Sequence, residues 1–383
     1  MTTAERPIRS DPKLDDAMAR SLEMGEVGIQ ICAYLDGDLV VDTCAGTMSR
    51  GGPLVSLDTL FPIYSVSKAA TALALHLQAE RGLVDVEAPI CTYWPEFAAN
   101  AKDSITVRDV LSHRSGFPQL PAEITPETII DWDWVVGRLA EMSPLCLPDT
   151  RNTYQALNFG WLIGEVVRRT DPDHRSIGRF IREELAGPLD AHDLYIGLPA
   201  AEIPRLAPGI LDVEPPEPTA IREAAVPRAV AIVPRIWNNE RFYTAELAAA
   251  GGVATARSVA RLFAMVANGG VFAGKRYLSQ SRVESFLVPR HDALRPDDTI
   301  GEFIYVGQGG LWLGETEPKY NHVVGIGDRI AYHAGSGGSI GWADVATGLS
   351  VSILHNRRYD GPWALDTHPF GEIAEVVRSI AYA

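Results

Sequence analysis

Apolar residues recur at strand-like spacing near both ends of this chain and at helical spacing between them. Two strand-like runs flank Asp36-Gly37, and because an Asp-Gly pair favours the tight turn that joins antiparallel strands, they predict a hairpin. Further strand-like runs follow toward the C-terminus, one of them rich in glycine. The predicted strands are 28–35, 39–45, 303–314, 329–333, 341–345 and 349–355.

Helical spacing dominates the middle of the chain, where proline-rich connections separate the apolar runs. The predicted helices are 12–24, 66–79, 106–113, 125–141, 160–170, 176–186, 255–267 and 370–381. This order indicates an α/β protein of the α+β kind, with an antiparallel sheet flanked by helices and an inserted, mainly helical subdomain. We expect 1–83 and 235–383 to form the sheet domain and 84–234 the helical subdomain, as a single catalytic unit with the active site at the junction.

Composition limits the function classes. The chain has 383 residues, 46% of them hydrophobic, which is enough for a large core. A net charge of −15 argues against nucleic acid or an anionic membrane as a partner. No apolar run reaches the roughly 18 residues of a membrane span, and the polar N-terminal segment does not resemble a signal peptide. We therefore expect a cytoplasmic protein that acts on a small molecule; the sequence leaves the oligomeric state open.

The four cysteines include no Cys-x-x-Cys pair. In the predicted hairpin, Cys32 faces the region of Val41 rather than Cys44, so we expect free thiols.

A serine stands three residues before a lysine at the start of an apolar helix, as Ser65-x-x-Lys68. Residues at this spacing share a helix face, and Lys68 is the only charged side chain from residue 66 to residue 79. Because desolvation lowers the pKa of an ammonium, Lys68 could be neutral and take the Ser65 proton, or stay charged and stabilise the alkoxide. The alternative is structural, with a helix-capping serine and a lysine whose stem is buried.

Two further segments can reach the same cleft. Tyr154 precedes an apolar helix, and a tyrosine near a cation can deprotonate and serve as a general acid or base. Its alternative role is that of a core tyrosine with a hydrogen-bonded hydroxyl. Segment 333–342 is rich in glycine, which lets backbone N–H groups approach a ligand as an oxyanion hole requires.

Together these segments resemble the three motifs of the serine β-lactamase and penicillin-binding protein superfamily: Ser65-x-x-Lys68, Tyr154, and the run at 333–335. The likeness is strongest to class C β-lactamase-like serine hydrolases known as family VIII carboxylesterases, and it covers nearly the whole chain. Other segments that read like this family are 81–85, 93–97, 105–118 and 337–344.

The resemblance implies a role for each motif residue. Ser65 would be the acylated nucleophile, with Lys68 and Tyr154 as the proton-transfer pair. The backbone N–H groups of Ser65 and Ser336 would form the oxyanion hole. The residues expected to contact substrate are His333, Gly335, Gln155 and Asn158. No cofactor is implied.

Two departures from the family pattern narrow the substrate. Penicillin-recognising members carry Lys-Thr-Gly where this chain has His333 and Ala334, so a permanent cation for a β-lactam carboxylate is missing. The usual Tyr-x-Asn reads Tyr154-Gln155-Ala156 here, which removes an amide that would bond an acylamino group. We therefore expect hydrolysis of carboxylic esters through an acyl-enzyme. The alternatives are an acyltransferase, and a β-lactamase or penicillin-binding sensor with little turnover.

Other candidate chemistry is weaker. The run 337–341 matches Gly-x-Ser-x-Gly at Ser339, but that motif needs a helix after the serine, and a strand is predicted there. His113 is expected to be structural, fixing a helix end and a loop. The acidic residues and His291 within 291–298 form a polar loop without metal-ligand spacing, so no metal is predicted.

Overall fold

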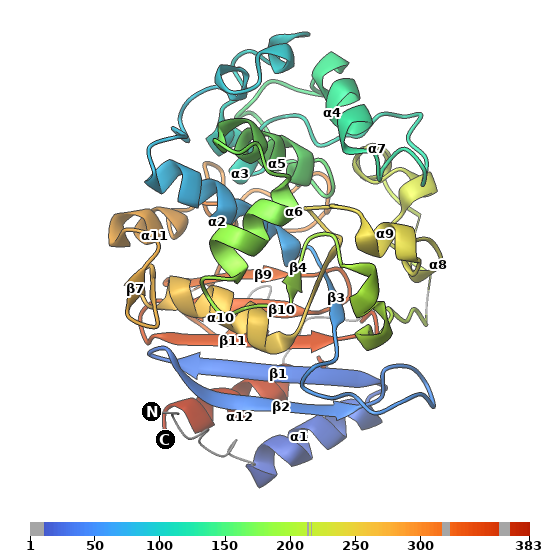
Figure 1. The fold of residues 1–383 in the computed structure, drawn as a ribbon, viewed down its shortest axis with the longest axis vertical. Coiled ribbons are helices and arrows are strands. Elements are labelled where there is room, and N and C mark those ends of the chain that lie inside the picture. The colour runs from blue at the N-terminus through green and yellow to red at the C-terminus, as the bar shows by residue number, and fades with distance from the viewer. Residues whose placement is uncertain (1–10, 213, 216, 316–321, 360–367) are drawn as a thin grey trace.

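A six-stranded antiparallel sheet forms the centre of the computed structural model, which describes residues 11–212, 214–215, 217–315, 322–359 and 368–383. The strand order is β2-β1-β11-β10-β9-β8, with helices above and below the sheet (Figure 1). Strands from both ends of the chain meet here, because β1 pairs with β11 along its length. The strands are β1 (Gly28–Leu35), β2 (Asp38–Gly46), β8 (Trp312–Leu313), β9 (Ile330–Ala334), β10 (Ile340–Asp344) and β11 (Leu349–His355).

Helices cover both faces of the sheet. Successive residues of β1 point to opposite faces: Ile31 belongs to the apolar cluster that contains α1 (Pro12–Glu23) and α12 (Gly371–Ala381), whereas Cys32 belongs to the cluster that contains α10 (Ala256–Ala267). Burial on both sides explains why β1 reads as a nearly continuous apolar run.

Helix α2 (Ser67–Glu80) connects the sheet to the helical part of the molecule. Every residue of α2 except the last is buried, and the helix packs against α5 (Phe159–Thr170) and contacts β9. None of the helices in the described part of the chain has the length and hydrophobicity that a membrane span requires. The other helices are α3 (Val107–Leu111), α4 (Trp132–Glu141), α6 (Ile177–Phe180), α7 (Ala220–Ala225), α8 (Pro234–Trp237), α9 (Glu240–Thr244) and α11 (Gln280–Phe286), with a π-helix at Ile181–Ala186 and 3₁₀ turns at Ile90–Thr92, Pro95–Ala98, Ala200–Arg205, Arg228–Val230 and His322–Val324.

A second sheet of three short strands sets the start of α2. It consists of β3 (Phe61–Tyr64), β5 (Gly252–Ala254) and β4 (Leu194–Tyr195), and β3 leads directly into α2. Strands β6 (Val271–Phe272) and β7 (Lys275–Arg276) form a separate hairpin. The sequence does not predict these strands, because two to four residues are too few to show alternation.

The structure confirms the α+β architecture, and the strands predicted at 28–35 and 349–355 have the observed bounds. Two predicted elements are wrong in part. Only the β8 residues of 303–314 are a strand, since glycine weakens a strand interior. The helix predicted at 125–141 begins at Trp132, where Asp131 caps it by accepting the Trp134 N–H at 3.0 Å. The division of the chain into two domains stays a prediction.

The cysteine prediction is confirmed. All four cysteines are free, and Cys32 lies opposite Asp42, next to Val41, whereas Cys44 lies opposite Gln30.

Candidate active site

Ser65 lies in the sharp turn between β3 and α2. Tyr64, the last residue of β3, has a φ of 46°, in the left-handed region that most side chains avoid. The Ser67 hydroxyl fastens the turn by donating to the Tyr64 carbonyl and accepting the Gly252 N–H at 2.9 Å. The Lys68 N–H closes it by donating to the Ser65 carbonyl at 3.0 Å. Ser65 therefore directly precedes the first turn of α2, on the side where Lys68 projects.

Lys68 is completely buried and reaches Ser65 directly. Its Nζ lies 3.2 Å from Ser65 Oγ, and it donates to the carbonyls of Ala156 at 2.7 Å and Ala249 at 2.9 Å. Burial lowers the pKa of Lys68 well below its ordinary value, and no carboxylate in the described part of the chain offsets this effect. The structure thus brings the two residues of the first motif together and favours the neutral amine.

Tyr154 lies beside Lys68, in the irregular segment before α5. Lys68 Nζ is 4.9 Å from the centroid of the Tyr154 ring, which also packs against His113 and Trp312 at centroid distances of 4.5 and 5.8 Å. Burial raises the pKa of Tyr154, and a hydrogen bond with the Ser65 side chain offsets this only in part. The phenol therefore keeps its proton at neutral pH, and the expectation that a nearby cation would deprotonate it is not supported.

A buried carboxylate fixes the backbone of Tyr154. Asp297 Oδ1 accepts the N–H groups of Tyr154 at 3.0 Å, Thr299 at 3.0 Å and Ile300 at 3.2 Å. Its Oδ2 lies 3.5 Å from both terminal nitrogens of Arg290, and neither side chain is exposed. Burial lowers the pKa of Arg290 to about 10, so its guanidinium stays charged at neutral pH. The sequence placed Asp297 only in a polar loop and gave no sign of this role.

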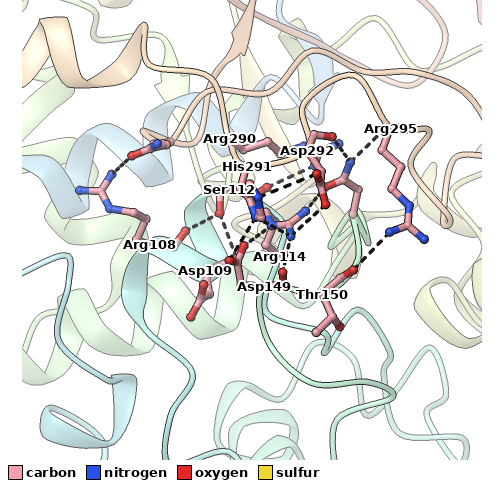
Figure 2. Close-up of polar contacts among 12 residues, drawn as sticks. Arg108, Asp109, Ser112, Arg114, Asp149, Thr150, Arg290, His291, Asp292 and Arg295 are labelled. Atoms are coloured by element: carbon pink, nitrogen blue, oxygen red, sulfur yellow. Dashed lines mark hydrogen bonds and ion pairs between the residues drawn. The ribbon is translucent and has the colours of Figure 1, made fainter.

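A second set of polar contacts ties the segment before Tyr154 to the 292–295 loop (Figure 2). The buried Arg114 side chain donates to the Asp149 carboxylate and, at 2.6 Å, to Asn152 Oδ1. Asn152 Nδ2 in turn donates to two backbone carbonyls of the 292–295 loop, each at 2.9 Å. The position of Tyr154 therefore depends on contacts from several distant segments.

His113 supports the Tyr154 segment from the other side. Its carbonyl accepts the Thr153 N–H at 2.9 Å, and its Nδ1 accepts the Gln155 N–H at 3.2 Å. Burial lowers the pKa of His113 well below its ordinary value, and the nearby Arg290 charge lowers it further. The expected structural role is therefore supported, and the loop that His113 fixes is the one that carries Tyr154.

The backbone N–H groups of Ser65 and Ser336 have no hydrogen-bond partner within the described residues. Gly335 brings the end of β9 close to the nucleophile, because a Cβ on Gly335 would lie 2.6 Å from the Ile63 carbonyl oxygen. Two unpaired N–H groups on adjacent segments suit a developing oxyanion. As oxyanion donors, Ser65 and Ser336 stay a prediction that this arrangement favours.

His333 on β9 is fully buried. Its Nδ1 lies 3.0 Å from the Ala334 carbonyl oxygen, which places the ring proton there, and Nε2 has no partner in the described part of the chain. The ring packs at 5.0 Å against Trp312, a residue that the sequence did not single out. Burial lowers the pKa of His333 to about 3, so this position brings no positive charge at neutral pH.

Gln155 and Asn158 are also fully buried, and they contact each other. Gln155 Nε2 donates to Asn158 Oδ1 at 3.4 Å, and Asn158 Nδ2 donates to the carbonyls of Phe117 at 2.6 Å and Gln119 at 3.2 Å. These bonds hold the loop at 117–119 beside α5. A substrate contact by either amide stays a prediction, and the Asn158 amide is already engaged by this loop.

The rival serine does not have the geometry of a nucleophile elbow. Ser339 Oγ makes hydrogen bonds of 3.3 Å with the backbone N–H and carbonyl of His355, and strand β10, not a helix, follows it. The rejection of this motif is confirmed.

Comparison with known proteins identifies the family. Residues 14–370 match the family described as Beta-lactamase. The esterase/beta-lactamase LipL of Mycobacterium tuberculosis is 33% identical over 370 residues, which cover 92% of this chain and 82% of LipL. A solved family VIII carboxylesterase has a TM-score of 0.88 at 30% identity and covers 98% of this chain and 99% of its own. A penicillin-binding protein homologue from Caulobacter crescentus has a TM-score of 0.83 at 28% identity, with coverages of 96% and 98%. The fold, the motif geometry and these matches together show that the chain belongs to the beta-lactamase family of serine hydrolases.

Proposed function

We propose that this chain hydrolyses carboxylic esters through an acyl-enzyme on Ser65. The observation that carries the proposal is the buried Lys68, whose Nζ lies 3.2 Å from Ser65 Oγ and whose pKa is strongly lowered. Similar proteins described as an esterase/beta-lactamase and a family VIII carboxylesterase support an ester substrate.

The hydrogen bonds of Lys68 support a role as general base. A neutral amine has two N–H groups and one lone pair. The carbonyls of Ala156 and Ala249 accept both N–H groups, which leaves the lone pair for the Ser65 hydroxyl. A charged ammonium would instead donate its third proton to Ser65 and could not accept one. Because burial favours the neutral form, Lys68 takes the Ser65 proton during attack.

The remaining groups complete a balanced reaction. Ser65 Oγ forms a bond to the ester carbonyl carbon, and the resulting oxyanion lies between the N–H groups of Ser65 and Ser336. The C–O bond to the alcohol then breaks, and Tyr154 protonates the departing alkoxide. Lys68 passes its proton to Tyr154, so both groups return to their initial states. Water releases the acyl group through the same proton transfers in reverse.

The neutral His333 favours esters over β-lactams. A lysine at this position would offer a fixed cation to a lactam carboxylate, whereas the buried imidazole carries no charge at neutral pH. Esters need only the nucleophile, the oxyanion donors and an apolar slot for the acyl group.

A panel of acyl p-nitrophenyl esters tests the proposal, with p-nitrophenol release as the rate signal and peptide mass spectrometry as the probe of acylation. We expect turnover of short acyl esters and a transient acyl mass on the Ser65 peptide. Ser65→Ala should abolish both without unfolding the protein. Ser339→Ala is the matched control, since it removes a nearby buried serine and should preserve turnover. Wild-type activity in Ser65→Ala would refute the assignment.

Two additions to the panel distinguish the alternatives. A chromogenic cephalosporin hydrolysed as efficiently as the esters would replace the esterase with a β-lactamase, and acylation without turnover would indicate a penicillin-binding sensor. Added alcohols that intercept the acyl group faster than water would indicate an acyltransferase.

A further inference from the structure

Arg222 on α7 has a guanidinium without a partner. Within the part of the chain that the structure describes, it makes no hydrogen bond, ion pair or ring contact, whereas the neighbouring Arg228 and Arg235 pair with glutamates. The adjacent Glu223 pairs with Arg228 instead. In a chain with a net charge of −15, an arginine left without an acidic partner calls for an explanation.

Helix α7 carries the exposed Arg222 beside the active site. The Val226 N–H donates to the Arg222 carbonyl at 2.8 Å, so Val226, the residue that follows α7, lies one helical turn from Arg222. Val226 packs against the apolar cluster that contains Tyr154 and Ala156. The Arg222 charge also lies close enough to the Tyr154 hydroxyl to lower its pKa against the larger effect of burial.

A second cation borders the same region beside the oxyanion donors. The Arg358 N–H donates to the Ile210 carbonyl at 2.8 Å, and one terminal nitrogen donates to the Ile232 carbonyl at 3.0 Å. The residue lies against Gly337, where a Cβ would be 2.9 Å from Arg358 Cα. Partial desolvation lowers the pKa of Arg222, and the like charge of Arg358 lowers it further, whereas Tyr154 and Asp297 raise it. A carboxylate bound to Arg222 would also be attracted by the Arg358 charge.

We propose that Arg222, assisted by Arg358, binds a carboxylate carried by the ester substrate. This inference rests on the ester hydrolysis proposed above and names its substrate class. The planar guanidinium fork of an arginine matches a carboxylate geometrically, and a fork without a protein partner is available for one. The subsite lies on the Tyr154 side of the active site, whereas a charge at position 333 would lie on β9. A local cation is also needed because the overall negative charge of the chain repels anionic ligands.

Matched ester pairs test this subsite and show which half of the substrate carries the charge. The acyl arm compares p-nitrophenyl hydrogen glutarate with p-nitrophenyl valerate. The alcohol arm compares the butyrate esters of 4-hydroxybenzoate and 4-hydroxybenzamide. The arm that responds is the one whose carboxylate reaches Arg222. In that arm, Arg222→Gln should lower the ratio of kcat/KM for the charged ester to that for the neutral ester by about 10-fold, mainly through KM, as for a hydrogen bond to a charged group. High salt should reduce the wild-type ratio.

Arg228→Gln is the control, because it removes the same charge from a second exposed arginine, which differs from Arg222 in having two glutamate partners. Its charged-to-neutral ratio should equal that of the wild type. An equal loss on both members of each pair in Arg222→Gln would show that Arg222 supports Tyr154 or the fold, and would overturn the subsite. If the wild type hydrolyses no ester, the esterase proposal has failed. The subsite is then tested by glutarate binding, measured as a shift in melting temperature. Glutarate should raise the melting temperature of the wild type but not of Arg222→Gln, and an equal shift in both would overturn the subsite.

Discussion

Replacing Asp297 by asparagine tests whether a buried ion pair holds Tyr154 in place. The asparagine keeps one oxygen for the three backbone N–H groups that the carboxylate accepts at 3.0 to 3.2 Å, but it removes the charge opposite Arg290. Breaking a buried pair costs about 3–5 kcal/mol, because the remaining charge stays desolvated. Native proteins are stable by about 5–15 kcal/mol, so Asp297→Asn should fold but lose a large share of its stability.

Urea unfolding measures this loss, and Asp298→Asn provides the matched control. Asp298 pairs with Arg151 at 2.5 Å, but both side chains are partly exposed, so its loss should cost no more than about 1 kcal/mol. Adding Arg290→Met to Asp297→Asn should recover stability, because it removes the unpaired charge. The kcat of Asp297→Asn should fall even where the protein is fully folded, since Tyr154 loses a charged acceptor. If Asp297→Asn matched Asp298→Asn in both stability and kcat, the reasoning would be refuted.

Three further predictions concern the buried ionisable groups. Tyr154→Phe removes one hydroxyl and keeps the ring contacts, so ester turnover should fall roughly 100-fold or more with little change in melting temperature; an unchanged rate would return Tyr154 to a purely structural role. His333→Asn should leave the acid limb of the pH–rate profile in place, because the pKa of His333 is already about 3; a moved limb would contradict this. Burial lowers the pKa of His76 from 6.5 to about 3, so the unfolded chain binds more protons between these values. The free energy of unfolding should therefore decrease as the pH is lowered from 6.5 to about 3, by up to about 1.4 kcal/mol per pH unit for this group. Urea unfolding across the window should show less acid sensitivity in His76→Leu, and equal sensitivity would count against the assignment.

Sequence patterns predicted those features whose physical cause is local. Strands β1 and β11 were found with their observed bounds because β1 is a nearly continuous apolar run, apolar residues and serines alternate at the start of β11, and turn residues precede or follow each strand. The burial of Lys68 followed from the lack of any other charge in residues 66–79, and the helix there is buried along nearly its whole length. The missing cation at His333 was evident from the residue type alone.

Contacts between distant segments left no comparable signal. Asp297 and Asp298 look alike in sequence, yet only Asp297 is fully buried, and it holds the backbone of a residue 143 positions away. Likewise, nothing local shows that His113 accepts the Gln155 N–H, or that the residue after α7 packs against the cluster that contains Tyr154. Strand β4 has only two residues and exists because β5 pairs with it. Such features depend on tertiary structure that a periodic pattern does not encode.

The ionisable groups around Ser65 are arranged so that none of those in the proposed mechanism is charged before the reaction begins. Burial favours neutral Lys68 and a protonated Tyr154, and His333 is uncharged, so the centre of the site starts the reaction without a full charge. In the proposed mechanism, the first charges to appear are the oxyanion and the protonated Lys68. They form close together and away from water, where their attraction is far stronger than in bulk solvent. This stabilisation exists only once attack has begun, so it lowers the barrier without tightening the ground state. In the proposed subsite, recognition of the substrate carboxylate falls to Arg222 and Arg358, so the groups that transfer protons do not need to carry a permanent charge.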